Sequence, residues 1–96
     1  MVIHGDIKLD IFARRLFINS RLVYLRNKEF SLLEYFIRNC GRVVSRTQIL
    51  EEVWDRNIFC STNTVDVHVS SLRKKLDNSH SSEKISTVHS IGYILD

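Results

Sequence analysis

The chain has no proline, only three glycines and only two cysteines, Cys40 and Cys60, among its 96 residues. A secreted domain of this size usually needs more disulfides than two cysteines can form, so we expect reduced thiols and a cytoplasmic location. No run of about 18 apolar residues is present, which argues against a membrane-spanning helix. The first ten residues carry His4, Asp6 and Lys8 and lack the apolar segment of a signal peptide.

Catalytic and metal-binding motifs are also missing from the sequence. The four histidines and two cysteines never fall at the close spacing of metal ligands. The glycines at positions 5, 41 and 92 lie too far apart for a phosphate-binding loop, and no G-x-S-x-G motif occurs. We therefore expect one small domain, residues 1–96, without enzymatic activity, cofactor or metal.

The charge of the chain gives only a weak indication of its partner. Lysine and arginine number 14 against 11 aspartates and glutamates, a net charge of +3. This excess is compatible with nucleic-acid binding but does not establish it. Whether the chain binds nucleic acid therefore has to be judged from where its charged residues lie.

The first quarter of the chain has the pattern of β-strands. From Val2 to Leu25, short apolar runs are separated by turn residues, which predicts three or four short antiparallel strands. Asn19 and Ser20 form a plausible tight hairpin turn, because asparagine tolerates a positive φ.

The middle of the chain changes to helical periodicity. Asn27 is the expected N-cap of a first helix, and Gly41 follows its end. Its apolar face is formed by Phe30, Leu33, Phe36, Ile37 and Cys40. Ser45 and Gln48 have the spacing of a capping box, which predicts a second helix that ends near Trp54. A connector, residues 55–61, follows.

A third helix is predicted from about Asn63 to Asp77, followed by a polar loop and a hairpin over residues 85–95. The buried face of this helix is expected to consist of Val65, Val69, Leu72 and Leu76. The opposite face carries Asn63, Thr64, Val67, Ser70, Ser71 and Lys74. Such a small, polar face fits a major groove: asparagine pairs with adenine, serine bonds to any base edge, and a valine methyl contacts thymine. An ordinary solvated helix face would have a similar composition.

Four segments of the chain resemble the DNA-binding domain of OmpR/PhoB-type response regulators. Residues 62–76, TNTVDVHVSSLRKKL, are similar to the recognition helix of that family. Lys28-Glu29-Phe30 with Leu32-Leu33 match the start of its first helix, and residues 41–46 with Val53 and Trp54 match its second. Thr87-Val88 and Gly92-Tyr93 match its wing. The resemblance extends in order over the whole chain.

The resemblance implies an α+β winged helix-turn-helix fold, with an N-terminal antiparallel sheet, three helices and a C-terminal β-hairpin wing. The function it implies is sequence-specific binding of double-stranded DNA for transcription regulation. The recognition helix, about residues 63–77, would enter the major groove, and the wing, about 85–95, the minor groove. The loop 55–61 would face RNA polymerase, with Arg56, Ile58 and Phe59 as contact residues.

The resemblance also suggests a role for individual side chains. Bases would be read by Asn63, Thr64, Val67, Ser70 and Ser71. The DNA backbone would be held by Trp54, His68, Arg73, Lys74, Thr87 and Tyr93. Asp66 is expected to orient a neighbouring basic side chain, because a carboxylate beside phosphates would be repelled.

The sequence departs from the family pattern at several positions. Ser70 and Ser71 stand where relatives often carry arginine, the strongest reader of guanine, so we expect weaker guanine recognition. In the wing, His89 replaces the arginine that usually enters the minor groove, and Ser90 replaces the glycine that follows it.

The family context implies further partners. A receiver domain and a sensor kinase would belong to the rest of the regulator, since these 96 residues are taken up by the effector domain. Tandem copies would bind direct repeats spaced by about one helical turn, roughly 10–11 base pairs. The isolated domain is expected to be a monomer. The alternative is a winged helix that contacts proteins and binds little or no DNA.

Overall fold

A computed structural model describes residues 1–54 and 61–96 of the chain. It begins with a four-stranded antiparallel sheet of β1 (Val2–His4), β2 (Ile7–Asp10), β3 (Arg15–Ile18) and β4 (Arg21–Val23), paired in sequence order. Asn19 and Ser20, with φ of 51° and 68°, form the turn between β3 and β4, which confirms the predicted hairpin. Alternate residues of β2 and β3 are buried, so one face of this sheet packs on the core.

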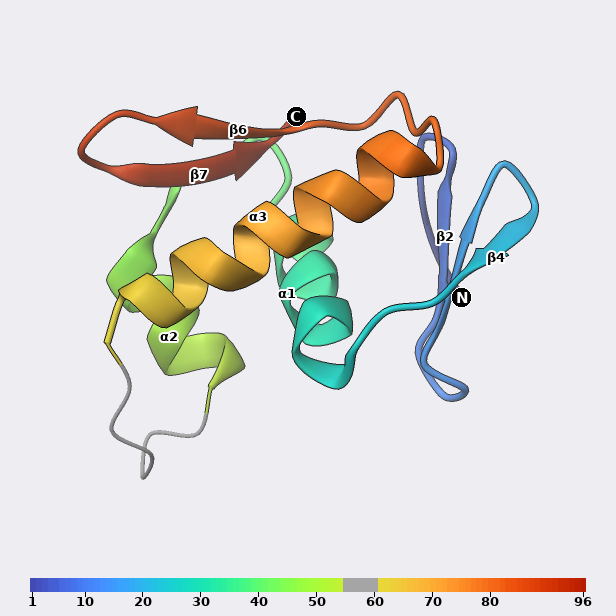
Figure 1. Cartoon of the computed structure of the whole chain (residues 1–96), viewed down its shortest axis with the longest axis horizontal. Coiled ribbons are helices and arrows are strands. Elements are labelled where there is room, and N and C mark those ends of the chain that lie inside the picture. Colours follow the sequence, from blue (N-terminus) through green and yellow to red (C-terminus); the bar gives the residue numbers. More distant parts are fainter. Residues whose placement is uncertain (55–60) are drawn as a thin grey trace.

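Three helices follow the sheet: α1 (Asn27–Arg38), α2 (Arg46–Val53) and α3 (Asn63–Asn78). The chain ends in a hairpin of β6 (Ile85–Val88) and β7 (Gly92–Leu95), here called the wing. Helix α3 lies between the wing on one side and α1 and α2 on the other (Figure 1). The N-terminal sheet lies beside the C-terminal end of α3 (Figure 1).

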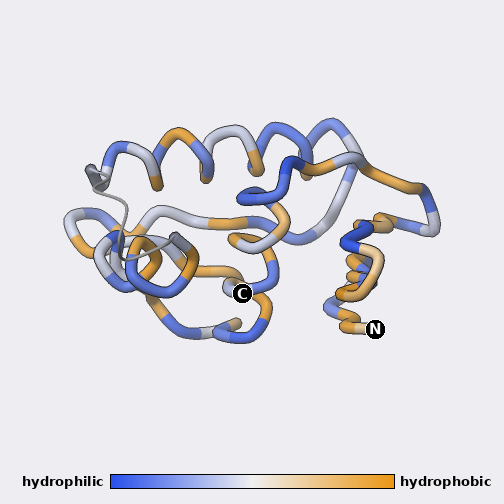
Figure 2. Tube along the Cα trace, turned by 90° about the horizontal axis from the view of Figure 1, so that it is seen from below, coloured by the Kyte–Doolittle hydropathy of each residue, from blue (hydrophilic) through white to orange (hydrophobic). Residues whose placement is uncertain are grey.

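The buried face of α3 matches the sequence prediction. Its four buried residues are Val65, Val69, Leu72 and Leu76. Along α3, hydrophobic and hydrophilic residues alternate as a helix with one buried face requires (Figure 2). Each of these side chains contributes about 1.5–3 kcal/mol by its burial, which fixes the helix on the core and decides which face remains outside.

The wing is larger than the sequence predicts, because a short strand is added to it. Strand β5 (Val44–Ser45) pairs with β7, giving a three-stranded sheet in the order β5-β7-β6. A Cβ atom on Gly92 would lie 2.0 Å from the backbone oxygen of Val44. The missing side chain of Gly92 therefore allows this close approach. A two-residue strand has no alternation of its own, so no pattern of residues predicts β5.

The helix ends agree with the sequence prediction with one correction. In α2, the Gln48 N–H donates to Ser45 Oγ at 3.0 Å and the Ser45 N–H donates to Gln48 Oε1 at 2.9 Å, which confirms the capping box. The prediction of Asn27 as the N-cap of α1 is wrong. Arg26 occupies that position, and its N–H donates to Glu29 Oε1 at 2.8 Å. The backbone of Arg26 is extended and this bond holds it at the start of the helix, so Asn27 lies inside the first turn.

Part of the predicted connector is not described by the structure. Arg56, Ile58 and Phe59, the predicted polymerase-contact residues, lie outside the described residues.

Within residues 1–54 and 61–96, no helix has the length and apolar character needed to span a bilayer.

Candidate nucleic-acid interface

The outward face of α3 presents a strip of exposed residues that points away from the core. Asn63, Val67, Ser70 and Lys74 are all exposed, at positions i, i+4, i+7 and i+11 of the helix. Val67 has 66% of its surface accessible, and among the described residues it is the one strongly exposed large hydrophobic side chain on a helix. A shallow hollow of about 450 Å³ follows this strip and is lined by Asp66, Val67, Ser70, Ser71 and Lys74. We call Asn63, Val67, Ser70 and Lys74 the outer strip.

The structure divides the predicted base-reading residues into two groups. Asn63, Val67 and Ser70 belong to the outer strip. Thr64 and Ser71 lie on the flank of α3 that faces α1 and α2, and both are half-buried. The Ser71 hydroxyl donates a hydrogen bond to Glu29 Oε2, so its proton is directed into the protein.

Two of the predicted backbone contacts lie together on the same flank. The rings of Trp54 and His68 meet edge to face, with centroids 4.9 Å apart and planes at 80°. His68 Nδ1 is 2.7 Å from the carbonyl oxygen of Thr64, so this nitrogen carries the proton and donates it. The Lys28 ammonium lies 5.9 Å from the Trp54 ring centre and donates to the carbonyl oxygen of Val53 at 3.2 Å. These contacts fix the His68 ring at the edge of the exposed face.

Glu29 is a buried acidic residue beneath the same flank, with only 1% of its surface accessible. Its carboxylate accepts from the Lys75 ammonium at 2.5 Å, from the Ser71 hydroxyl and from the Arg26 N–H. Burial acts to raise the pKa of Glu29, but the hydrogen bonds from Lys75, Ser71 and Arg26 outweigh it and lower the pKa. Sequence reasoning missed this residue, because an acidic residue in a first helical turn is typical of a simple cap.

The lowered pKa of Glu29 predicts a loss of stability in acid. The stabilising contribution of the ionised carboxylate is fully present above the ordinary pKa of 4.5 and is lost as the pH falls through the lowered folded-state pKa. We expect Glu29→Gln to lower the unfolding free energy by about 2 kcal/mol at pH 7 and by much less near pH 3. Urea denaturation across this pH range measures the difference.

The matched control is Glu34→Gln, because Glu34 forms an i,i+4 pair with Arg38 on the surface of the same helix. This variant should change the stability by less than about 0.5 kcal/mol at every pH. Equal pH profiles for the two variants would contradict the role given to Glu29.

The other flank of α3 is joined to the wing through Asp66. Its Oδ1 accepts from Arg46 Nε at 2.7 Å and from the Tyr93 hydroxyl at 2.5 Å. Burial opposes the ionisation of Asp66, but the Tyr93 and Arg46 hydrogen bonds lower its pKa. As expected, Asp66 orients a basic side chain. Sequence reasoning did not identify Arg46 as that side chain, since the two are 20 positions apart.

The predicted backbone residues Arg73, Thr87 and Tyr93 also lie together. Arg73 Nε donates to the carbonyl oxygen of Ile85 at 2.9 Å, and its Nη2 donates to Thr87 Oγ1 at 2.6 Å. The same guanidinium lies 5.1 Å from the centre of the Tyr93 ring. Tyr93 is buried and its hydroxyl is bonded to Asp66, so a phosphate contact by that hydroxyl would have to replace this bond. These residues fix the wing to α3, while His89 is exposed between β6 and β7.

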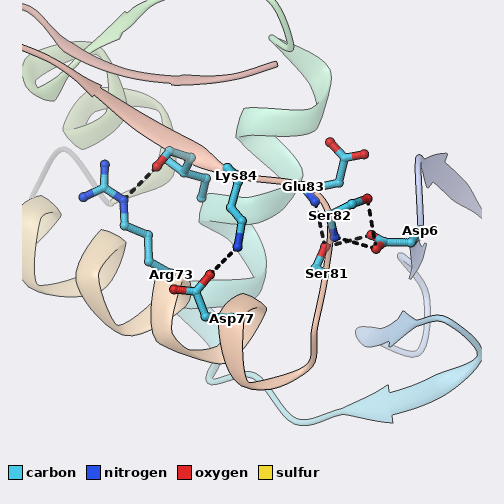
Figure 3. Close-up of polar contacts among 8 residues, drawn as sticks. Asp6, Arg73, Asp77, Ser81, Ser82, Glu83 and Lys84 are labelled. Atoms are coloured by element: carbon cyan, nitrogen blue, oxygen red, sulfur yellow. Dashed lines mark hydrogen bonds and ion pairs between the residues drawn. The ribbon is translucent and has the colours of Figure 1, made fainter.

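A second polar cluster fixes the loop between α3 and the wing (Figure 3). The Asp6 carboxylate accepts from the Ser81 hydroxyl at 2.7 Å and from the Ser82 N–H at 2.7 Å. Burial acts against ionisation here too, but these bonds lower the pKa of Asp6. Lys84 pairs with Asp77 at 2.6 Å near the end of α3. The N-terminal sheet thus supports the base of the wing.

Across residues 1–54 and 61–96, no three His, Cys, Asp or Glu side chains are grouped to hold a metal.

Comparisons with known proteins agree with this geometry. Residues 20–95 match the family model described as "Transcriptional regulatory protein, C terminal". The transcriptional regulatory protein CusR of Escherichia coli is 40% identical over 92 residues, which cover 96% of this chain and 40% of that protein. The phosphate regulon transcriptional regulatory protein PhoB of Rhizobium meliloti is 46% identical over the same length and coverage. The chain therefore spans about 40% of the length of these relatives.

Solved structures show the same fold. The DNA-binding domain of the response regulator AdeR, solved with an intercistronic region, matches with a TM-score of 0.88 and 26% identity, covering 99% of this chain and 98% of that one. The Klebsiella pneumoniae RstA DNA-binding domain, solved in complex with the RstA box, matches with a TM-score of 0.82 and 27% identity, covering 98% and 94%.

Proposed function

Since this chain belongs to the family of C-terminal domains of OmpR/PhoB-type transcriptional regulatory proteins, and so acts as a DNA-binding output domain, we propose that α3 and the wing form its DNA-binding surface. The observation that carries this proposal is the outer strip: four exposed, non-acidic residues along one line of α3. A rigid helix with such a face fits the major groove, because no acidic side chain on that face would repel the phosphates that border the groove.

The contacts on both flanks of α3 support this role. Glu29 holds one flank through Lys75 and Ser71, and Asp66 and Arg73 hold the other against the wing. The helix and wing are therefore positioned before DNA arrives, which lowers the entropic cost of binding. Docking of α3 in the major groove would bring the wing, and with it His89, toward an adjacent minor groove.

We divide the contacts by their place on α3 and the wing. Asn63, Val67 and Ser70 would read bases from the outer strip, and Thr64 and Ser71 would contribute from its flank. Phosphates would be bound or approached by Trp54, His68, Arg73, Lys74, Thr87 and Tyr93, with Arg46 added from the structure. Most of these residues also hold one another in place, so their effect on affinity is partly one of positioning.

The remaining proposals concern the longer regulator. A receiver domain controlled by a sensor kinase would regulate binding, tandem copies would occupy direct repeats, and residues 55–61 would contact RNA polymerase. The activity is binding alone, without catalysis or cofactor, and its location is the cytoplasm, where bacterial DNA lies. The isolated domain would be a monomer.

In vitro selection from a random duplex library, followed by a salt titration of the enriched duplex, tests the proposed function. We expect a motif repeated at about 10–11 base pairs and an affinity that falls steeply with salt. The competing proposal is a winged helix that contacts other proteins. It predicts no enriched motif and a weak affinity that does not depend on sequence.

Lys74 gives a direct test of the phosphate contacts. We expect Lys74→Ala to reduce the slope of log affinity against log salt concentration by about 1, because one fewer counterion is released. Fluorescence anisotropy at four salt concentrations measures this slope. The matched control is Lys8→Ala, since Lys8 is exposed on the N-terminal sheet and should leave the slope unchanged. A slope change for Lys8 and none for Lys74 would move the binding surface away from α3.

A further inference from the structure

The Ser71 hydroxyl has an unusual position at the edge of the DNA-facing surface. Ser71 is half-buried, and it lines the hollow along the outer strip together with Val67, Ser70 and Lys74. At the same time its proton is donated inward, to Glu29 Oε2. The neighbouring Ser70 is exposed on the outer strip.

The bonding of Glu29 explains why the Ser71 proton stays directed inward. Glu29 Oε1 accepts from the Arg26 N–H at 2.8 Å and from the Lys75 ammonium at 2.5 Å. Oε2 is left to the Ser71 hydroxyl, and no donor other than Ser71 is bonded to it among the described residues. Turning the hydroxyl toward DNA would leave a buried carboxylate oxygen without a donor, which is costly. The lowered pKa of Glu29 keeps the carboxylate ionised at neutral pH.

A serine hydroxyl has one proton to donate and two lone pairs that accept. With its proton given to Glu29, Ser71 can only accept hydrogen bonds from a ligand. In the major groove, the groups that donate are the N6 amine of adenine and the N4 amine of cytosine. Guanine presents only N7 and O6 and thymine only O4, all of which accept. A serine in this state can therefore bond to adenine or cytosine, but not to guanine or thymine.

We propose that Glu29 is a specificity-determining residue that acts through Ser71, making it an acceptor that selects adenine or cytosine over guanine or thymine on the DNA strand it faces. This inference rests on the proposed function, because it requires α3 to lie in the major groove. Glu29 itself does not touch DNA and is a positioning residue.

The isosteric variant Glu29→Gln should remove the preference, because Ser71 could then both donate to a base and accept from one. If the amide oxygen keeps the Arg26 N–H bond, the amide NH2 takes the place of Oε2 and donates to Ser71 Oγ. The Ser71 proton is then released toward the DNA, where guanine and thymine can accept it. A merely structural role for Glu29 would lower the affinity for all sequences equally.

The experiment is in vitro selection with four proteins: wild type, Ser71→Ala, Glu29→Gln and the control Glu34→Gln, each with its melting temperature recorded. The position of the selected motif whose base preference changes in Ser71→Ala is the position that faces Ser71. We expect adenine or cytosine there for the wild type, favoured by about threefold to tenfold. Ser71→Ala and Glu29→Gln should both lose this preference, and Glu34→Gln should match the wild type.

A second measurement keeps the test valid if Glu29→Gln does not fold. The selected adenine or cytosine is replaced by its analogue without the exocyclic amine. Wild-type affinity should fall by about threefold to tenfold, and Ser71→Ala should show no difference between the two duplexes.

The outcomes distinguish a failure of the proposed function from a failure of this inference alone. If no protein enriches any motif, the proposed function fails and this inference fails with it. If motifs are enriched, three results would each overturn the inference alone. Ser71→Ala changes the base preference at no motif position, or the wild type prefers guanine or thymine at the position that faces Ser71. The third is that folded Glu29→Gln keeps the wild-type preference at that position.

Discussion

Val67→Glu should weaken binding to the selected duplex by about 100-fold, or roughly 3 kcal/mol, without unfolding the domain. Val67 is the most exposed apolar residue of α3, at the centre of the outer strip. The substitution removes an apolar contact with the bases and places a carboxylate among phosphates, which repel it. Because the side chain has 66% of its surface accessible, the stability should change by less than about 0.5 kcal/mol.

Leu22→Glu is the matched control for this variant. Leu22 is equally exposed, with 64% of its surface accessible, but it lies on the N-terminal sheet. Anisotropy titrations of both variants against the selected duplex should show the 100-fold loss for Val67→Glu only. A loss of similar size for Leu22→Glu would mean that added negative charge acts at long range, and it would remove the evidence for contact at α3.

Gly92→Ala should cost about 2–3 kcal/mol of unfolding free energy and lower the melting temperature by about 10 °C. The added Cβ would lie 2.0 Å from the carbonyl oxygen of Val44 and 2.9 Å from Ser45 Cα. Both neighbours belong to the backbone, so the clash is relieved only if β5 separates from β7. The wing would then shift relative to α3, and DNA affinity should fall as well.

Gly41→Ala makes the same chemical change where space is open, since no atom of the described residues other than its chain neighbours lies within 4 Å of the added Cβ. Its φ of +79° disfavours alanine, so we expect a cost of about 1 kcal/mol from backbone strain alone. Thermal denaturation of the two variants separates crowding from strain. Equal losses would show that β5 does not press on β7 as the structure indicates.

The features that follow from local pattern could be predicted from the sequence. The Asn19-Ser20 turn, the Ser45 capping box and the buried face of α3 all depend on neighbouring residues, and all three were confirmed. Strand β5 could not be predicted, because two residues form a strand only when a distant glycine lets them approach. The N-cap of α1 was misjudged because the bond from the Arg26 N–H to Glu29 starts the helix one residue earlier.

In the candidate site too, local features could be predicted from the sequence and contacts between distant residues could not. Periodicity placed Val67 and Ser70 on the exposed face of α3, which the structure bears out. It could not show that Ser71 is bonded to a carboxylate 42 residues earlier in the chain. It also could not show that Arg73 and Thr87, both proposed to contact phosphates, bond to each other. Tertiary contacts of this kind decide which side chains remain free to meet DNA.

The most direct test of the DNA-binding surface is an NMR titration of the ¹⁵N-labelled domain with the selected duplex. We predict that the largest amide shifts fall on residues 63–74 of α3 and on the wing near His89, with small shifts in β1 to β4. Large shifts centred on the N-terminal sheet, with α3 unchanged, would contradict the account.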